Sequence, residues 1–146
     1  MTDAIETGYL LDSDTISLYV HHQERHEILK NRILSVANKR IRVPIVVVEE
    51  ALAGAFALIN NPKNPAGMTA GCQFLRKIMS DYSEFQIFPF DPNAQAIYKS
   101  MSAETKRLGK NDCKIAAIAL ANGLTVVTRN VKHFVQIPNA TFEDWT

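Results

Sequence analysis

Three acidic residues stand where short apolar segments end or where helical segments begin. Asp12 closes the apolar run Tyr9–Leu11, while Glu50 lies about one turn into one predicted helix and Asp112 lies at the start of another. Gathered at one site, three carboxylates would raise the pKa of at least one of them by mutual repulsion, unless a divalent cation neutralised them. Mg²⁺ prefers oxygen ligands together with several waters. The residue types therefore predict a site for a hard divalent cation.

A divalent cation held in this way suits phosphate chemistry. It can orient a phosphodiester, lower the pKa of an attacking water and stabilise charge on the leaving oxygen. A protein nucleophile is not required, and neither Ser13 nor Cys113 has a sequence neighbour that resembles a general base. Taken singly, each acid has a simpler interpretation as a helix cap or a solvated surface group. Taken together, the acids favour phosphodiester hydrolysis.

Alternating strands and helices must position these acids. Apolar and β-branched runs predict strands at Tyr9–Leu11, Ile41–Val43, Phe85–Phe90, Leu124–Thr128 and Thr141–Phe142. Helical spacing, capping residues and glycine breaks predict helices over 22–38, from Pro44 to before Asn60, and over 68–81, 91–108 and 111–122. This alternation predicts an α/β fold of three layers, with a central parallel sheet of four or five strands flanked by helices. Ligands bind at the carboxyl ends of such strands, where the acids fall.

Length and composition agree with one compact domain. The chain has 146 residues, of which 47% are apolar, and this is enough for a single core. We therefore expect a single domain over residues 1–146. The formal net charge is +1, so RNA binding would need a local group of Lys and Arg side chains. Cys72 and Cys113 lack CxxC spacing, which favours reduced thiols.

The first residues do not predict a targeting signal. They include Asp3 and Glu6 in place of a basic segment followed by an apolar run. Nor does any stretch approach the ~20 apolar residues of a membrane helix. We therefore expect a cytoplasmic protein.

Four stretches of the sequence resemble a known family. In order along the chain, LLDSD, VEEALAG, NDCKIAAIALANG and TVVTRN are similar to the successive motifs of VapC-type PIN-domain ribonucleases, the toxins of type II toxin–antitoxin systems. The resemblance covers nearly the whole chain and implies a PIN-like domain with divalent-metal-dependent endoribonuclease activity. It makes Asp12, Glu50 and Asp112 the metal-binding acids. Asn130 takes a fourth catalytic position, where many relatives carry Asp.

The resemblance also implies cofactors and partners. It predicts Mg²⁺ or Mn²⁺ as the cofactor, RNA as the substrate, a homodimer, and a cognate antitoxin whose C-terminal segment occupies the acidic groove. The neutral Asn130 gives this site one fewer negative charge than sites with a fourth acid, so chemistry with one or with two metal ions is left open.

Further polar residues near the acids allow more than one interpretation. Thr128 could hydrogen-bond the site or a phosphate, or it could simply be a β-branched strand residue. Lys110 and Arg129 flank the acids and could hold RNA phosphates, although basic side chains are by default a solvated face. His133 stands alone beside a turn, so we assign it no role.

Two other functions compete with the nuclease. Asp12 and Asp14 together with Thr128 are similar to the acids and Thr of a phosphoacceptor receiver domain. A receiver needs an Asp at the end of the third strand and a Lys at the end of the last, whereas this chain has Asp91-Pro92 and Arg129 there. A PIN-like module that binds RNA without cutting it is the second alternative, and three intact acids argue against it.

Overall fold

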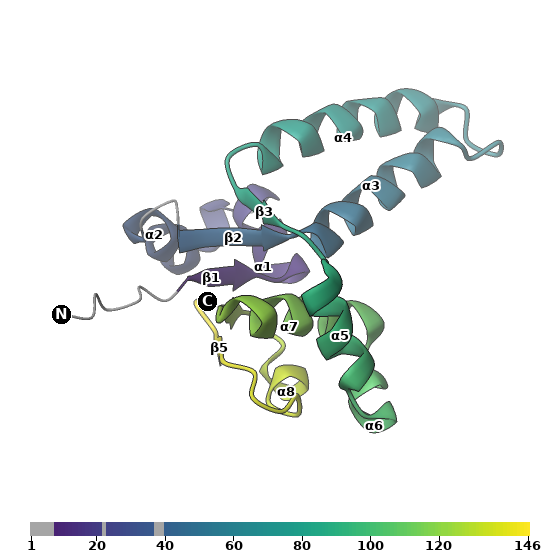
Figure 1. The fold of residues 1–146 in the computed structure, drawn as a ribbon. Coiled ribbons are helices and arrows are strands. Elements are labelled where there is room, and N and C mark those ends of the chain that lie inside the picture. Colours follow the sequence, from purple (N-terminus) through teal and green to yellow (C-terminus); the bar gives the residue numbers. More distant parts are fainter. Residues whose placement is uncertain (1–7, 22, 37–39) are drawn as a thin grey trace.

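A five-stranded sheet runs through the centre of the structure, a computed structural model that describes residues 8–21, 23–36 and 40–146 (Figure 1). Its strands are β1 (Tyr9–Leu11), β2 (Ile41–Pro44), β3 (Gln86–Phe88), β4 (Thr125–Val127) and β5 (Phe142–Glu143). They lie in the order β3-β2-β1-β4-β5, and each neighbouring pair is parallel. The predicted α/β fold with a parallel sheet of four or five strands is confirmed.

The strand order creates a switch point between β1 and β4. From β1 the chain adds β2 and β3 on one side, and it later returns to add β4 and β5 on the other. The pairing of Leu11 with Val127 brings the carboxyl ends of β1 and β4 side by side, where open α/β sheets bind their ligands. A receiver domain has the order 2-1-3-4-5, so the receiver alternative is wrong.

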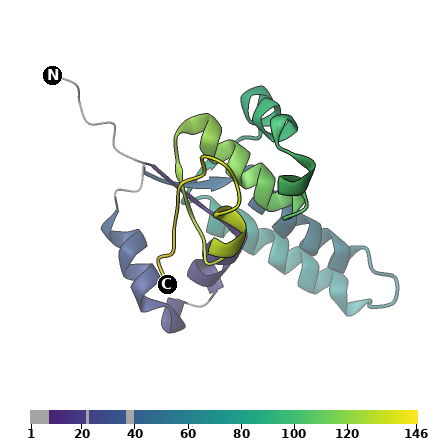
Figure 2. The same cartoon turned by 90° about the horizontal axis from the view of Figure 1, so that it is seen from below.

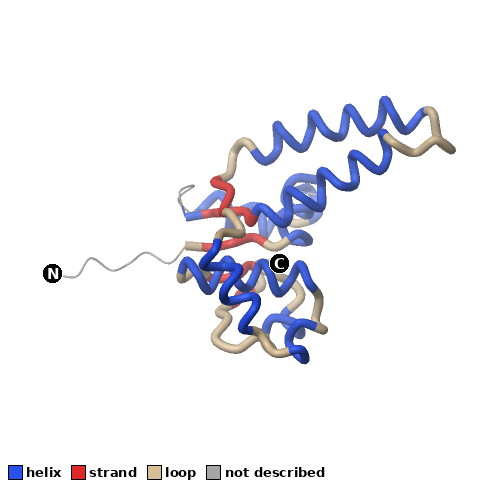
Figure 3. Tube along the Cα trace, turned by 45° about the vertical axis from the view of Figure 1, so that its right-hand side comes forward, coloured by secondary structure: helices blue, strands red, loops and turns tan. Residues whose placement is uncertain are grey.

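Helices cover both faces of the sheet (Figures 2 and 3). They are α1 (Ser13–His21), the 3-10 turn η1 (Gln23–Arg25), α2 (Glu27–Ser35), α3 (Ile45–Ile59), α4 (Ala66–Tyr82), α5 (Pro92–Ser100), α6 (Ala103–Lys106), α7 (Lys110–Asn122) and α8 (Val131–Phe134). In Figure 2, α1 and α2 lie on one side of the strands, and α5 and α7 lie on the other. Right-handed crossovers place the helices of the two directions of sheet growth on opposite faces in this way. Among the described residues, no helix has the length and apolar character needed to cross a membrane.

The core forms between the sheet and α7. Leu10 and Val126 on the strands and Ile115 and Ile118 on α7 are fully buried, and each such side chain contributes about 1.5–3 kcal/mol of transfer free energy. This packing fixes α7 against the sheet. Its first turn therefore has a defined position at the carboxyl edge.

Glycines set both ends of α7, as the sequence predicts. Gly109 precedes the helix with φ 139°, and Gly123 follows it with φ 63° and ψ 36°. Residues with a side chain rarely adopt either backbone conformation, whereas glycine does so at little cost. The helix therefore starts just before Asn111 and Asp112, which places both residues in its first turn.

Two predicted helices are wrong in extent. The helix predicted over 91–108 divides into α5 and α6, because Met101 adopts an extended conformation and the Ser102 hydroxyl then caps α6 by accepting from the Thr105 N–H at 3.0 Å. The helix predicted over 22–38 is shorter, since α2 begins after the non-helical His26. Residues 22, 37 and 38 of that prediction, like Asp3 and Glu6, lie outside the described part of the chain. Helix α8 has no counterpart among the predictions.

Candidate active site

Asp12 follows β1 and caps helix α1. Its Oδ1 accepts a hydrogen bond of 2.9 Å from the backbone N–H of Thr15, so the cap interpretation considered above is correct in part. The side chain is nevertheless buried, with Asp12 4% exposed. Burial raises the pKa of the Asp12 carboxyl above its ordinary value, and hydrogen bonds with Thr128 and Thr15 offset part of that rise. A buried acid of this kind is poised to accept a cation.

Thr128 links the ends of β1 and β4. It is fully buried, directly after β4, and its hydroxyl lies within hydrogen-bonding reach of Asp12. The same hydroxyl accepts from the backbone N–H of Asn130 at 2.8 Å. Thr128 therefore hydrogen-bonds the site, as one interpretation allowed, whereas its complete burial argues against direct contact with a phosphate. The threonine holds the turn after β4 against the acid after β1.

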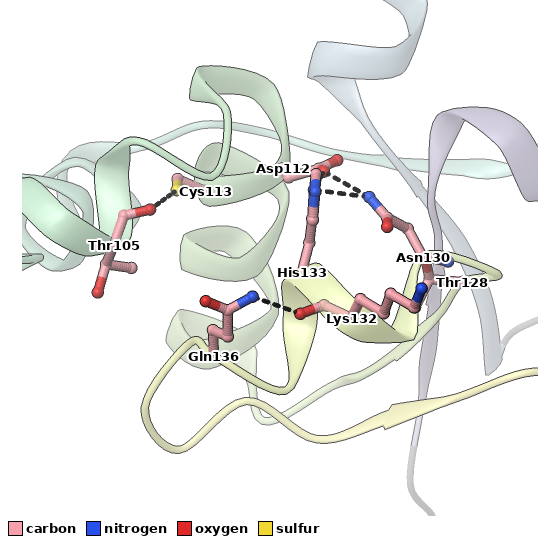
Figure 4. Close-up of polar contacts among 8 residues, drawn as sticks. All are labelled: Thr105, Asp112, Cys113, Thr128, Asn130, Lys132, His133 and Gln136. Atoms are coloured by element: carbon pink, nitrogen blue, oxygen red, sulfur yellow. Dashed lines mark hydrogen bonds and ion pairs between the residues drawn. The ribbon is translucent and has the colours of Figure 1, made fainter.

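Asp112 projects from the first turn of α7 toward α8 (Figure 4). Its Oδ2 lies 3.1 Å from Asn130 Nδ2 and 3.1 Å from His133 Nδ1. The apolar face below it is buried, as predicted, through Ile115, Ala116 and Ala119. Asp112 is therefore an acid held at the site by side chains of another segment.

His133 also contacts these residues. The sequence analysis assigned it no role because it stood alone in the sequence, and that premise is wrong. His133 Nδ1 lies 2.7 Å from Asn130 Nδ2 as well as near Asp112. When Nδ1 carries a proton it can donate to the Asp112 carboxylate, and when it does not it can accept from the Asn130 amide, so the tautomer decides which neighbour His133 binds. The spacing of three residues between Asn130 and His133 is the signal that could have revealed it, because that spacing puts both on one face of a helical turn.

Glu50 lies on α3 and is exposed, but both of its carboxylate oxygens have partners. Ser13 Oγ donates to Oε2 at 2.8 Å, and Asn111 Nδ2 donates to Oε1 at 2.5 Å. Ser13 is the residue after Asp12, and Asn111 is the residue before Asp112. Three sequence segments thus converge on Glu50.

The residues fit a hard cation in their chemistry, although they do not form a closed cluster. Among the described residues, no three His, Cys, Asp or Glu side chains gather closely enough to hold a metal by themselves. The candidate ligands are carboxylates, and the buried Asp12 has a raised pKa that a nearby cation would lower. Mg²⁺ usually keeps several waters and takes only one or two carboxylates. An open set of acids is compatible with such an ion.

Basic side chains at the rim differ in how free they are. Lys106 and Lys114 pack their ammonium groups over the rings of Tyr98 and Phe90, at 5.2 and 5.5 Å from the ring centroids. Arg129 is exposed and lies 3.7 Å from Asp14 in a solvent-exposed ion pair, which contributes little to stability. Lys110 is exposed at the start of α7. Lys110 and Arg129 are thus exposed cations close in sequence to Asp112 and Asn130.

Fold and site together define a class of protein. The chain is a parallel α/β domain with polar contacts of two aspartates, a glutamate and two asparagines near the carboxyl edge of the sheet. The PIN domain family model matches residues 9–139, and the chain belongs to the PIN-domain family. Nucleases of this family generally depend on a divalent cation.

Known relatives agree with this assignment along the chain. The chain is 26% identical over 141 residues to Ribonuclease VapC2 of Rickettsia felis, covering 94% of this chain and 97% of that protein. It is 24% identical, with the same coverage, to the tRNA(fMet)-specific endonuclease VapC of Salmonella typhimurium. The solved structure of DNA-bound VapBC from Salmonella typhimurium superposes with a TM-score of 0.76 at 24% identity, covering 96% of this chain and 99% of that chain. That likeness shows a common fold.

Proposed function

We propose that this chain is a divalent-metal-dependent endoribonuclease that acts as the toxin of a toxin–antitoxin pair. The observation that supports the proposal is that Ser13, beside Asp12, and Asn111, beside Asp112, both donate to the Glu50 carboxylate. The relatives named ribonuclease and endonuclease support the same reaction, since each is similar to this chain over 94% of its length. We extend the proposal to a single PIN-like domain over residues 1–146 that works in the cytoplasm, where its RNA substrate is made.

The three acids would hold the cation, and we propose Mg²⁺, with Mn²⁺ as a substitute. When bound, the ion supplies Lewis-acid stabilisation of the phosphate and an activated water. Asp12 contributes a carboxylate in a buried, low-dielectric position, where attraction to a cation is strong. Asn130 orients Asp112 through its amide, and its neutrality leaves the site one negative charge short of a site with four acids. In this proposal the acids hold the cation and Asn130 orients Asp112, and the attacking group is water rather than a protein nucleophile.

RNA would bind along the basic rim of this edge. Lys110 is exposed two residues before Asp112, and Arg129 is exposed directly before Asn130, so their charges can reach the phosphates that flank the cut. The buried Thr128 hydroxyl accepts from the Asn130 backbone N–H and so holds the turn that carries both Arg129 and Asn130. Arg129 would exchange its weak pairing with Asp14 for a phosphate.

We also propose a homodimer and a cognate antitoxin as protein partners. Helices α3 and α4 pack against each other and project beyond the sheet (Figure 1). Large apolar side chains on this pair are exposed, namely Phe56, Leu58, Met68 and Met79. Exposed apolar surface of this kind favours protein contacts. Recovery of the tagged chain from cells as a monomer, without a small copurifying protein, would contradict this part.

Cleavage of a mixed pool of small RNAs tests the enzymatic part. Purified chain is incubated with Mg²⁺ or Mn²⁺, beside samples with EDTA and beside the double variant Asp12→Asn, Asp112→Asn. We expect cutting by the wild type that requires the metal and disappears in the double variant. Equal cutting by both proteins would reveal a contaminant. RNA binding without cutting would favour the non-cleaving PIN-like module instead.

A further inference from the structure

We propose that Ser13 and Asn111 are positioning residues that together hold the Glu50 carboxylate in place for metal binding. The inference rests on the proposed function, because Glu50 is one of the three proposed metal ligands. Ser13 donates to one carboxylate oxygen at 2.8 Å, and Asn111 donates to the other at 2.5 Å. The donors come from α1 and α7, two helices that are distant from α3 in sequence.

Glu50 needs such support because of its location. It is exposed on α3, and an exposed glutamate ordinarily samples several rotamers that must be given up when it binds a ligand. Two donors acting on different oxygens fix both the position and the plane of the carboxylate. Both donors are neutral, so they leave its charge available to a cation. A carboxylate has about four lone-pair sites, so two remain for the ion.

The two donors also tie Glu50 to the other acids. Ser13 directly follows Asp12, and Asn111 directly precedes Asp112. Each hydrogen bond therefore sets the distance between Glu50 and the backbone that carries one aspartate. In this way two neutral side chains link Glu50 to the two segments that carry the aspartates.

A purely structural role for the two residues is the competing explanation, because both lie in the first turns of their helices. Helix α1 already has a cap, since the Asp12 carboxylate accepts from the Thr15 N–H. The Asn111 amide donates to a residue 61 positions away rather than to the start of its own helix. A structural role predicts a loss of stability on substitution, whereas a positioning role predicts a loss of metal affinity.

Titration of the metal-free full chain with Mn²⁺, followed by electron paramagnetic resonance of the free ion, separates the two explanations. We expect Ser13→Ala and Asn111→Ala each to weaken Mn²⁺ binding by about 10-fold, as for other residues that orient metal ligands. The Tm measured in EDTA should stay close to that of the wild type. Ser13→Thr, which keeps the hydroxyl, should retain most of the affinity. In a Glu50→Gln background, the two alanine substitutions should cause no further loss.

Matched controls come from the same residue types elsewhere. Ser35→Ala and Asn122→Ala each remove a side chain that bonds only its own helix backbone among the described contacts, and they should leave Mn²⁺ affinity unchanged. Unchanged affinity in Ser13→Ala and Asn111→Ala, or a full further loss in the Glu50→Gln background, would overturn the inference while leaving the proposed function intact. A wild-type chain that binds no Mn²⁺ would overturn both.

Discussion

The acids of this site are held in two different ways. Asp12 is buried after β1, where it accepts from the Thr15 backbone N–H in the first turn of α1 and hydrogen-bonds the buried Thr128 hydroxyl. Glu50 and Asp112 are reached by solvent, and side chains from other segments hold them: Ser13 and Asn111 for Glu50, and Asn130 and His133 for Asp112.

This difference separates what the fold provides from what individual side chains provide. The position of Asp12 follows from β1 and the start of α1, because the residue directly after β1 lies at the carboxyl edge of the sheet. Glu50 and Asp112 depend on four neutral or weakly basic partners, each of which a point mutation can remove. We therefore expect the position of Asp12 to tolerate changes in nearby side chains, while its function depends on its own charge. The positions of Glu50 and Asp112 should depend on the side chains that contact them.

The largest effect should come from removing the charge of either aspartate. Asp12→Asn and Asp112→Asn keep the size of the side chain, and we expect each to reduce RNA cleavage by about 100- to 1,000-fold, the range for loss of one group that stabilises transition-state charge. Single-turnover cleavage in Mg²⁺ measures this effect. Asp144→Asn, an acid near the C-terminus, is the control. Near wild-type activity in either site variant would show that the substituted aspartate is not part of the catalytic site.

A smaller effect should follow when the partners of Asp112 are removed. Asn130→Ala deletes the amide that bonds Asp112, and we expect cleavage to fall about 10-fold, near the lower limit for groups that orient a metal ligand. His133→Ala should reduce cleavage less, because Asn130 still reaches Asp112. Full activity in Asn130→Ala would show that Asp112 needs no such support and that the two kinds of acid do not differ.

The sequence predicted the part of the site that the fold provides. The apolar run before Asp12, the buried stripe below Asp112 and the glycines around α7 are local patterns. The parallel sheet follows from the alternation of predicted strands and helices. The contacts of His133, Ser13 and Asn111 were not predictable in this way, because they join segments up to 61 residues apart. The break at Ser102 was missed for a different reason: the backbone leaves the helix at Met101, within an otherwise helical pattern.

The basic rim should change binding rather than chemistry. Lys110→Gln and Arg129→Gln should each weaken RNA binding uniformly across sequences and reduce the slope of log affinity against log salt concentration by about 1. Fluorescence anisotropy with a catalytically inactive double aspartate variant measures both quantities. Lys63→Gln, in the linker between α3 and α4, is the matched control. An unchanged slope would mean that RNA phosphates bind elsewhere.

The smallest effect should be on stability, and it concerns only the buried acid. The raised pKa of Asp12 means that the folded state holds its proton more tightly than the unfolded state, so this group costs stability as pH rises from 3.8 through the raised pKa. In EDTA at pH 7.5, Asp12→Asn should therefore melt a few degrees above the wild type. Below pH 3.8 the difference should vanish. A lower Tm for the variant at pH 7.5 would mean that the charged carboxylate stabilises the fold.

The central claim, that these acids direct a metal ion to an RNA phosphate, is tested most directly by metal rescue. RNA transcribed with phosphorothioate linkages is cleaved in Mg²⁺ or in Mn²⁺, because sulfur binds Mg²⁺ poorly and accepts the softer ion better. We predict slow cleavage of the modified RNA in Mg²⁺, recovery in Mn²⁺, and no recovery in the Asp12→Asn, Asp112→Asn variant. Equal cleavage of modified and unmodified RNA in Mg²⁺, or cleavage that persists in EDTA, would contradict the account.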